Sequence, residues 1–276
     1  MIASSDYEFL CAFLLKRSGL YLGPSKEYLL EARLIPVAQT WGLAGLEQLV
    51  LDLRRNNNER LNSAVTEAMT TNETLFFRDK TPFDELRDLL LPPILESRKS
   101  SARLRIWCAA ASTGQEPYSL AMMLLDSFPQ LESWKIDIVG TDLCTKALAR
   151  AEEGVYSQFE VQRGLPIQHL MKNFEQVPTG WKIKSVLKKH IQYRSLNLLD
   201  NFTHLGQFDL IMCRNVLIYF ENDVKKRILD RMSGMLRSDG YLILGAAETV
   251  MGITDKFDRN RDCKAAVYRP MSAVRV

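Results

Sequence analysis

The hydrophobic pattern of the chain changes after residue 98, and this change constrains the fold more than any other feature. Up to residue 70, apolar residues recur at helical spacing; those of the stretch 9–14 fall on one face of a helix that Gly19 can end. Beyond residue 98, short apolar runs typical of strands alternate with helical patterns. We therefore predict three parts: an all-helical N-terminal domain at 1–70, a linker and connecting helix at 71–98, and an α/β domain at 99–276.

The α/β region contains at least five strand-like runs separated by helical patterns. Such alternation predicts a mostly parallel sheet that is covered by helices on both faces. We expect the helix of 223–237 to continue until Asp239 and Gly240 end it. Ligands of these sheets bind beyond the carboxyl ends of the strands, so the residues that follow each strand are candidates for a site. The runs lie at 103–109, 135–142, within 190–199, at 208–214 and 241–248, with a further one at 264–270.

Polar side chains follow three of these runs. Asp142 ends the second run and is placed either to accept the ribose hydroxyls of a nucleoside or to cap the next helix. Asn197 and Asn215 follow the third and fourth runs, and each is also a common turn residue. The loop AAASTGQEP after the first run either approaches a ligand closely or is a tight turn. Carboxylate and amide groups after three strands favour a shared ligand.

Composition and missing motifs narrow the chemistry. A net charge of +3 is too small to indicate nucleic-acid binding over the whole surface. The five cysteines are scattered and the three histidines lack ligand spacing, which argues against a disulfide framework or a metal site and for a reducing compartment. The chain lacks G-x-x-x-x-G-K-[ST] and G-x-S-x-G, which disfavours ATP hydrolysis and hydrolase chemistry. A reaction whose reactivity resides in a cofactor fits best.

The chain shows no targeting or membrane signal. Its N-terminal stretch MIASSDYEFL carries Asp6 and Glu8 where a signal peptide would be basic and then apolar. No apolar run approaches the roughly 20 residues that a membrane-spanning helix needs. We therefore expect a soluble, cytoplasmic protein. The final segment MSAVRV carries no signal that we can interpret.

Five segments together resemble the chemotaxis receptor methyltransferase (CheR) family. The resemblance covers residues 5 to about 269 in the family's order. It implies a Rossmann-like class I methyltransferase domain with a small antiparallel β-subdomain inserted at about 156–194, preceded by the helical domain. It also implies that a methyl group passes from S-adenosylmethionine to glutamate side chains of chemoreceptors, leaving S-adenosylhomocysteine, with no metal. The segments are TTNETLFFRD, RIWCAAASTGQEPYSLAM, GTDLCTKALARAEEGVY, SLNLLD and FDLIMCRNVLIYF.

The resemblance assigns cofactor-binding residues position by position. Arg78 suits the cofactor's carboxylate because a guanidinium can bind it bidentately. Asp142 would take the ribose, and the edge of Asn197 and Leu198 the adenine. The loop reads AAAST here where relatives commonly have AGCST, so small residues are kept. The full predicted set is Asn72, Thr74, Arg78, Glu116, Asp142, Asn197, Leu198, Arg214 and Asn215.

The chemistry implied by the resemblance needs no general base, because a glutamate carboxylate is already ionised at neutral pH. Tyr219 could orient the incoming carboxylate, although a half-buried aromatic in a turn is an equal alternative. Arg78 could help to attract that carboxylate. We expect Phe76 and Phe77 to pack between the linker and the sheet rather than to cover the pocket. The alternatives are a methyltransferase that acts on another protein or on a small molecule, and a non-catalytic S-adenosylmethionine-binding regulator.

The expected insertion is the most basic part of the chain. Between residues 156 and 194 seven cationic side chains stand against two glutamates, a net charge of 7 − 2 = +5. The stretch GWKIK…HIQYR alternates as a hairpin does. The resemblance implies that this insertion and the N-terminal domain contact the cytoplasmic part of chemoreceptors, which would recruit the protein, expected to be a monomer, to membrane receptors. The short loop QVPTG argues against tight docking of a receptor's C-terminal tail.

Overall fold

The computed structural model describes residues 2–55 and 58–271, so most of the MSAVRV tail lies outside it. The chain divides into two compact units. We call Met1–Thr71 with Tyr219–Val224 the helical unit, and Asn72–Ile218 with Lys225–Val276 the sheet unit. Across the described ranges, no helix combines the length and the apolar character that a membrane crossing requires.

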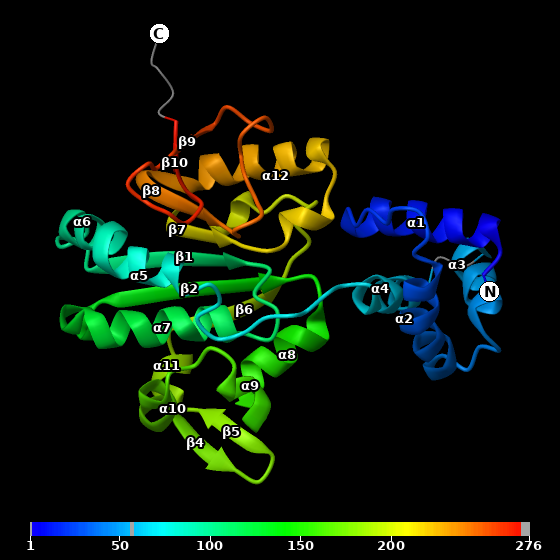
Figure 1. Cartoon of the computed structure of the whole chain (residues 1–276), viewed down its shortest axis with the longest axis horizontal. Coiled ribbons are helices and arrows are strands. Elements are labelled where there is room, and N and C mark those ends of the chain that lie inside the picture. The colour runs from blue at the N-terminus through cyan, green and yellow to red at the C-terminus, as the bar shows by residue number, and fades with distance from the viewer. Residues whose placement is uncertain (1, 56–57, 272–276) are drawn as a thin grey trace. The chain divides into compact units, whose positions relative to one another are not determined.

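The helical unit contains four helices around one apolar core (Figure 1). The first helix ends where Gly19 takes a left-handed conformation with φ 73°, as its sequence predicts. Arg33, in the second helix, is half-buried. Its guanidinium donates hydrogen bonds to the carbonyls of Met69 and Thr70 at 2.7 and 2.9 Å, which fixes the end of the fourth helix. The helices are α1 (Ser4–Ser18), α2 (Glu27–Thr40), α3 (Leu46–Arg55) and α4 (Glu59–Ala68).

The sheet unit is built on a seven-stranded sheet in the order β6-β2-β1-β7-β8-β10-β9. The first five strands of this order are parallel, and the last two pair antiparallel. The strand β7 is buried along its whole length, because both faces of a parallel sheet are covered. The strands are β1 (Arg103–Ala109), β2 (Lys135–Asp142), β6 (Ile191–Ser195), β7 (Phe208–Cys213), β8 (Leu236–Leu244), β9 (Phe257–Arg259) and β10 (Val267–Pro270).

Helices connect these strands and cover the sheet. The connecting segment after the linker consists of α5 (Thr81–Glu85), the π-helical turn η1 (Leu86–Leu90) and α6 (Leu91–Ser97). The helices α7 (Gln115–Ser127) and α8 (Thr145–Glu153) pack against β2 and β6. The helix α12 (Asn222–Met235) ends earlier than the sequence predicts. Residues 236–240 extend β8 instead, since Leu236 pairs with Phe208 of β7 across a bulge.

A second, three-stranded sheet lies in the insertion, where its order is β3-β5-β4. The hairpin joins β4 and β5, so our prediction that HIQYR belongs to it is wrong, whereas the strand that we predicted within 190–199 is confirmed. That stretch is β6, which pairs parallel with β2 at the edge of the large sheet. Figure 1 shows α9, α10, β4 and β5 gathered at the lower end of the unit, and we call residues 155–188 the lobe. Its elements are β3 (Val155–Tyr156), α9 (Gln158–Gln162), α10 (Ile167–Asn173), β4 (Phe174–Val177), β5 (Gly180–Ile183) and α11 (Ser185–Lys188).

Candidate functional site

The linker TTNETLFFRD is bound tightly to the sheet unit. The Phe76 side chain is fully buried and its ring packs edge-on against Tyr156 and Phe174, with centroids 5.0 and 5.7 Å away. The Phe77 backbone N–H donates to the Ser119 hydroxyl at 2.9 Å. Phe77 itself is half-buried. The packing role that we predicted for Phe76 is therefore confirmed, and the linker reaches the carboxyl ends of the strands in a fixed position.

Arg214, directly after β7, connects three segments at that edge. Its guanidinium donates to the Glu116 carboxylate at 2.8 Å, to the Asp79 carboxylate at 2.7 Å and to the Arg78 carbonyl at 2.9 Å. Its side chain is only 2% exposed. The structure thus brings together Arg78, Glu116 and Arg214, which the sequence singled out, and adds Asp79, which it did not.

Glu116 is a buried carboxylate at the start of α7, with a side chain 12% exposed. Burial raises the pKa of Glu116, and the adjacent Arg214 guanidinium opposes that rise. The Nε atom of Arg214 is buried and has no hydrogen-bond partner among the described residues. A buried donor without a partner is costly, so it is a place where a polar group of a ligand fits.

Asp142, at the end of β2, holds the loop that follows β1. One carboxylate oxygen accepts from the Ser112 backbone N–H at 2.8 Å, and the other accepts from the Cys144 backbone N–H at 2.9 Å. The Ser112 hydroxyl in turn donates to the carbonyl of Asn72 in the linker at 2.8 Å. The N-cap position of α8 is Cys144, so Asp142 is not the N-cap residue. Asp142 is buried, with 8% of its surface exposed.

The turn after β6 lies next to Asp142, because the Leu196 backbone N–H donates to the Asp142 carbonyl at 3.0 Å. The Asn197 side chain accepts from the Leu199 backbone N–H at 3.0 Å, which makes Asn197 a turn residue as well as a candidate ligand. Leu198 is buried beside it. The edge that we predicted for the adenine is therefore a well-defined turn at the end of the parallel strands.

Two segments at this edge, the linker and the loop after β1, hold strained backbone. Phe77, Ala110 and Ser112 have φ values of 49°, 66° and 52°, which are rare for residues with a Cβ atom. Strain of this kind concentrates at functional sites, where the surrounding packing maintains it. Ala110 stands where relatives commonly carry glycine, so the small side chain retained here still costs conformational energy. Gly114 has φ 93°, and a Cβ atom there would lie 2.7 Å from the Tyr193 hydroxyl oxygen.

The remaining predicted residues are placed as follows. Thr74 is half-buried within the linker, and the Arg78 guanidinium donates to the Glu73 carbonyl at 3.1 Å. Asn215 follows Arg214 with φ 58°. Tyr219 belongs to the helical unit, where its carbonyl accepts from the Tyr21 backbone N–H at 3.1 Å.

Sequence reasoning missed Glu248, which lies in the turn after β8. This buried carboxylate accepts hydrogen bonds from the backbone N–H groups of Asn215 and Gly245, both at 2.7 Å. Its second oxygen accepts from Val216 and Leu217. The signal was present, because the strand-end rule that selected Asp142 also applies to the run YLILGAAE.

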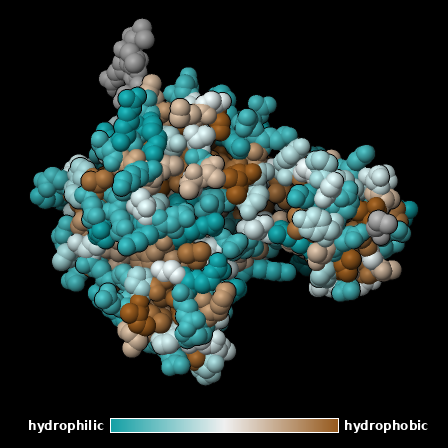
Figure 2. Space-filling model, in the orientation of Figure 1, coloured by the Kyte–Doolittle hydropathy of each residue, from teal (hydrophilic) through white to brown (hydrophobic). Residues whose placement is uncertain are grey.

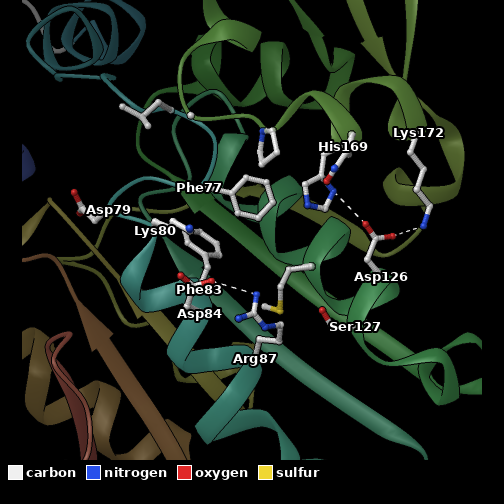
Figure 3. A pocket seen from close by; sticks show the side chains of 15 residues that line it. Phe77, Asp79, Lys80, Phe83, Asp84, Arg87, Asp126, Ser127, His169 and Lys172 are labelled. Atoms are coloured by element: carbon white, nitrogen blue, oxygen red, sulfur yellow. Dashed lines mark hydrogen bonds and ion pairs between the residues drawn. The ribbon is translucent and has the colours of Figure 1, made fainter.

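A separate cavity of about 660 Å³ lies between the linker, α5, the C-terminal part of α7 and α10. Figure 3 shows the Phe77 ring facing His169 across it, and the two rings stack with centroids 5.0 Å apart. Asp126 pairs with both His169 and Lys172 at its rim. This cavity contains none of the predicted cofactor residues. In the part of the chain that the structure describes, no cluster of three or more His, Cys, Asp or Glu side chains is arranged to hold a metal ion.

Comparison with known proteins identifies the family to which the chain belongs. Residues 5–70 match the family model "CheR methyltransferase, all-alpha domain", and residues 72–265 match "CheR methyltransferase, SAM binding domain". The chain is 38% identical over 271 residues to Chemotaxis protein methyltransferase 1 of Vibrio cholerae, covering 97% of this chain and 98% of that protein. It is 39% identical over 272 residues to Chemotaxis protein methyltransferase 1 of Pseudomonas aeruginosa, with coverage of 97% and 98%. It is 32% identical over 265 residues to the Chemotaxis protein methyltransferase of Salmonella typhimurium, with coverage of 93% and 88%.

These matches confirm the resemblance, the fold class and S-adenosylmethionine as the cofactor that we predicted from the sequence. The site fits that cofactor, since it offers a cation in Arg78, a carboxylate in Asp142 and an unpaired donor in Arg214. The chain therefore belongs to the CheR methyltransferase family of S-adenosylmethionine-dependent chemotaxis protein methyltransferases.

Proposed function

We propose that this protein methylates glutamate side chains on the cytoplasmic helices of chemoreceptors, giving glutamate methyl esters and S-adenosylhomocysteine. The family membership gives the methyl donor and the connection to chemotaxis. One observation supports a carboxylate as the methyl acceptor. Among the described residues, the histidines lie away from the strand ends, and the carboxylates Glu116 and Asp142 already accept hydrogen bonds, so neither kind of group is ready to remove a proton from an acceptor.

All three histidines lie away from the carboxyl ends of the strands. His169 is in α10, while His190 and His204 precede β6 and β7. The carboxylates at the site are already occupied as hydrogen-bond acceptors, as Glu116 is by Arg214 and Asp142 by two backbone N–H groups. An amine or hydroxyl acceptor would have to lose a proton, whereas a glutamate with a reference pKa of about 4.3 is already ionised.

The protein's own contribution is then binding and alignment. S-adenosylmethionine supplies a methyl group on a positively charged sulfur, which makes that methyl group electrophilic. We propose that Arg78 binds the cofactor's carboxylate, Asp142 its ribose, and the turn of Asn197 and Leu198 its adenine. We propose that Arg214 sets the position of Arg78, whose carbonyl accepts from its guanidinium. Alignment of reactants in this manner can supply much of a rate enhancement.

The proposal is tested with S-adenosylmethionine carrying a labelled methyl group and membranes that contain a chemoreceptor. We expect label on the receptor that alkali releases as methanol, because carboxylic methyl esters hydrolyse in base and methylamines do not. Receptor whose candidate glutamates are replaced by alanine is the control and should stay unlabelled. Label that survives alkali would contradict the glutamate acceptor. Intact cofactor binding without any label would favour the alternative, a non-catalytic regulator.

For the receptor-binding surface we propose the lobe together with the helical unit. Figure 2 shows apolar surface over the lobe that carries α10, and the exposed apolar side chains of the lobe include Phe159, Ile167 and Met171. Contiguous exposed apolar surface often marks a protein-binding site. The turn between β4 and β5 contains only Pro178 and Thr179, which supports receptor contact without tight docking of a C-terminal tail.

Several cationic side chains of the lobe already form ion pairs or hydrogen bonds within the sheet unit. Lys172 pairs with Asp126, while Lys184 and Lys188 donate to the carbonyls of Lys172 and Glu153. Lys182, in β5, is exposed. Exposed charges at an interface mainly change the association rate and its salt dependence. The cations free to attract an acidic receptor surface are therefore fewer than the sequence suggests.

The charge role is tested by a lobe variant, Lys182→Glu with Lys189→Glu, since both side chains are exposed and Lys189 directly follows the last residue of the lobe. We expect slower receptor methylation with a flatter salt dependence, and unchanged cofactor affinity in the absence of receptor. A matched control, Lys99→Glu with Lys256→Glu, changes the net charge equally at exposed positions outside the lobe. If the control slows methylation as much as the lobe variant, net charge and not the lobe is responsible.

A further inference from the structure

Glu248 stands out among the buried carboxylates because it accepts four backbone hydrogen bonds. One oxygen accepts from Asn215 and Gly245 at 2.7 Å each, and the other from Val216 at 2.9 Å and Leu217 at 2.7 Å. The residue is 7% exposed. Four donors at these distances give both carboxylate oxygens their hydrogen-bond partners, so this buried acidic side chain is satisfied without a cationic side chain.

The geometry around Glu248 leaves little freedom. A Cβ atom on Gly245 would lie 2.7 Å from a carboxylate oxygen of Glu248 and 2.9 Å from both the backbone nitrogen and the side-chain nitrogen of Asn215. The turn after β7 and the turn after β8 therefore lie in direct contact. The Glu248 carboxylate accepts hydrogen bonds from backbone N–H groups of both turns. Asn215 is held at φ 58°, in the left-handed region that few residues other than glycine adopt.

The turn that Glu248 holds also carries Arg214. Arg214 precedes Asn215 in the chain and directly follows β7. Its guanidinium reaches Glu116, Asp79 and the Arg78 carbonyl, so its direction decides how the linker and the start of α7 meet. A rotation of the Asn215 backbone toward negative φ values would change the directions of the Arg214 and Asn215 side chains.

We propose that Glu248 is a positioning residue for the cofactor site, which fixes Asn215 and Arg214 through its four backbone hydrogen bonds. The inference concerns S-adenosylmethionine binding only, and it holds whichever group accepts the methyl. It assigns to the turn after β8 a role in cofactor affinity, although none of its residues was predicted as a cofactor contact.

The test is the variant Glu248→Gln. Glutamine has the same shape, but whichever way its amide rotates, an NH₂ group faces two of the four backbone N–H donors. We expect S-adenosylhomocysteine to bind at least tenfold more weakly by calorimetry without receptor. We also expect faster hydrogen exchange at the amides of Asn215, Val216 and Leu217.

The matched control is Glu85→Gln. Glu85 is also a buried carboxylate that accepts two backbone N–H groups, those of Lys264 and Ala265, at 2.6 and 3.0 Å. Neither of those residues belongs to the predicted cofactor set. We expect this variant to lose thermal stability while its affinity for S-adenosylhomocysteine stays within twofold of wild type.

Two results would overturn the proposal. If Glu248→Gln binds S-adenosylhomocysteine within twofold of wild type, Glu248 stabilises the fold and nothing more. If Glu85→Gln weakens S-adenosylhomocysteine binding as much as Glu248→Gln does, the loss of affinity comes from lower overall stability and not from a positioning role of Glu248. Should Glu248→Gln fail to fold, Gly245→Ala provides the same test, because its Cβ atom separates the two turns while the carboxylate remains. Neither result bears on the glutamate acceptor, which the receptor-labelling experiment tests separately.

Discussion

Replacing Asp142 by asparagine should weaken both the fold and the cofactor, and the two effects can be measured apart. In the wild type both carboxylate oxygens accept backbone hydrogen bonds, from Ser112 at 2.8 Å and from Cys144 at 2.9 Å. Asparagine keeps one acceptor and turns an NH₂ group toward the other donor. Hydrogen bonds to charged groups contribute about 1.5–3 kcal/mol each, so we expect the free energy of unfolding to fall by about that amount.

The magnitude translates into a measurable change. For a unit of this size 1 kcal/mol shifts Tm by about 2–4 °C, so Asp142→Asn should unfold about 3–12 °C below the wild type without cofactor. Asp142→Ala loses both hydrogen bonds, and its free energy of unfolding should fall by about 3–6 kcal/mol. Because Asp142 is buried, the alanine variant should be destabilised even without cofactor.

Calorimetry at a temperature well below the unfolding transition then measures the cofactor affinity of the folded variant, and so tests whether Asp142 binds the ribose. Loss of the proposed ribose hydrogen bonds should weaken S-adenosylmethionine binding to Asp142→Asn by about 1–3 kcal/mol. A variant with wild-type Tm would refute the structural role of the carboxylate. A variant that melts early but binds the cofactor like the wild type would refute the ribose role and leave Asp142 as an anchor of the loop after β1.

Ala110→Gly should raise the free energy of unfolding by about 1 kcal/mol, since Ala110 has φ 66°; thermal unfolding checks this, and an unchanged or lower Tm would contradict it. Phe76→Ala should lower the free energy of unfolding by about 3–5 kcal/mol, because its fully buried ring contacts Tyr156 and Phe174, and denaturant titration measures the loss. Burial lowers the pKa of His169 although Asp126 opposes the shift, so His169 contributes stability above its unfolded pKa of about 6.5 that is lost as pH falls through the lower folded pKa. The Tm difference between wild type and His169→Gln should therefore shrink or reverse from pH 8 to pH 5, and parallel curves would show that the group is not shifted. S-adenosylmethionine and S-adenosylhomocysteine should each bind with an affinity that a chelator does not change. Calorimetry that shows binding only with added metal would argue against a metal-free site.

The sequence by itself determined the kinds of element and their order. The run FDLIMC is apolar because both faces of β7 are covered, and Gly19 ends α1 because glycine adopts the left-handed conformation without a Cβ penalty. These are local properties of the chain, so a periodicity argument reaches them. The strand-end rule likewise selected Asp142 and Asn215 as candidates, because the ends of the buried strands β2 and β7 are visible as changes from apolar to polar residues.

Only the tertiary structure decided which segments pair and which polar groups meet. The alternation in HIQYR suits a hairpin strand and a parallel edge strand equally, and it is the pairing with β2 that makes it β6. Asp79 and Arg214 are 135 residues apart in the sequence, and Glu248 and Asn215 are 33 apart, yet each pair lies within 2.7 Å. A hydrogen bond depends on directions and distances of a few tenths of an ångström, and these arise only when the strands carrying both partners are packed side by side.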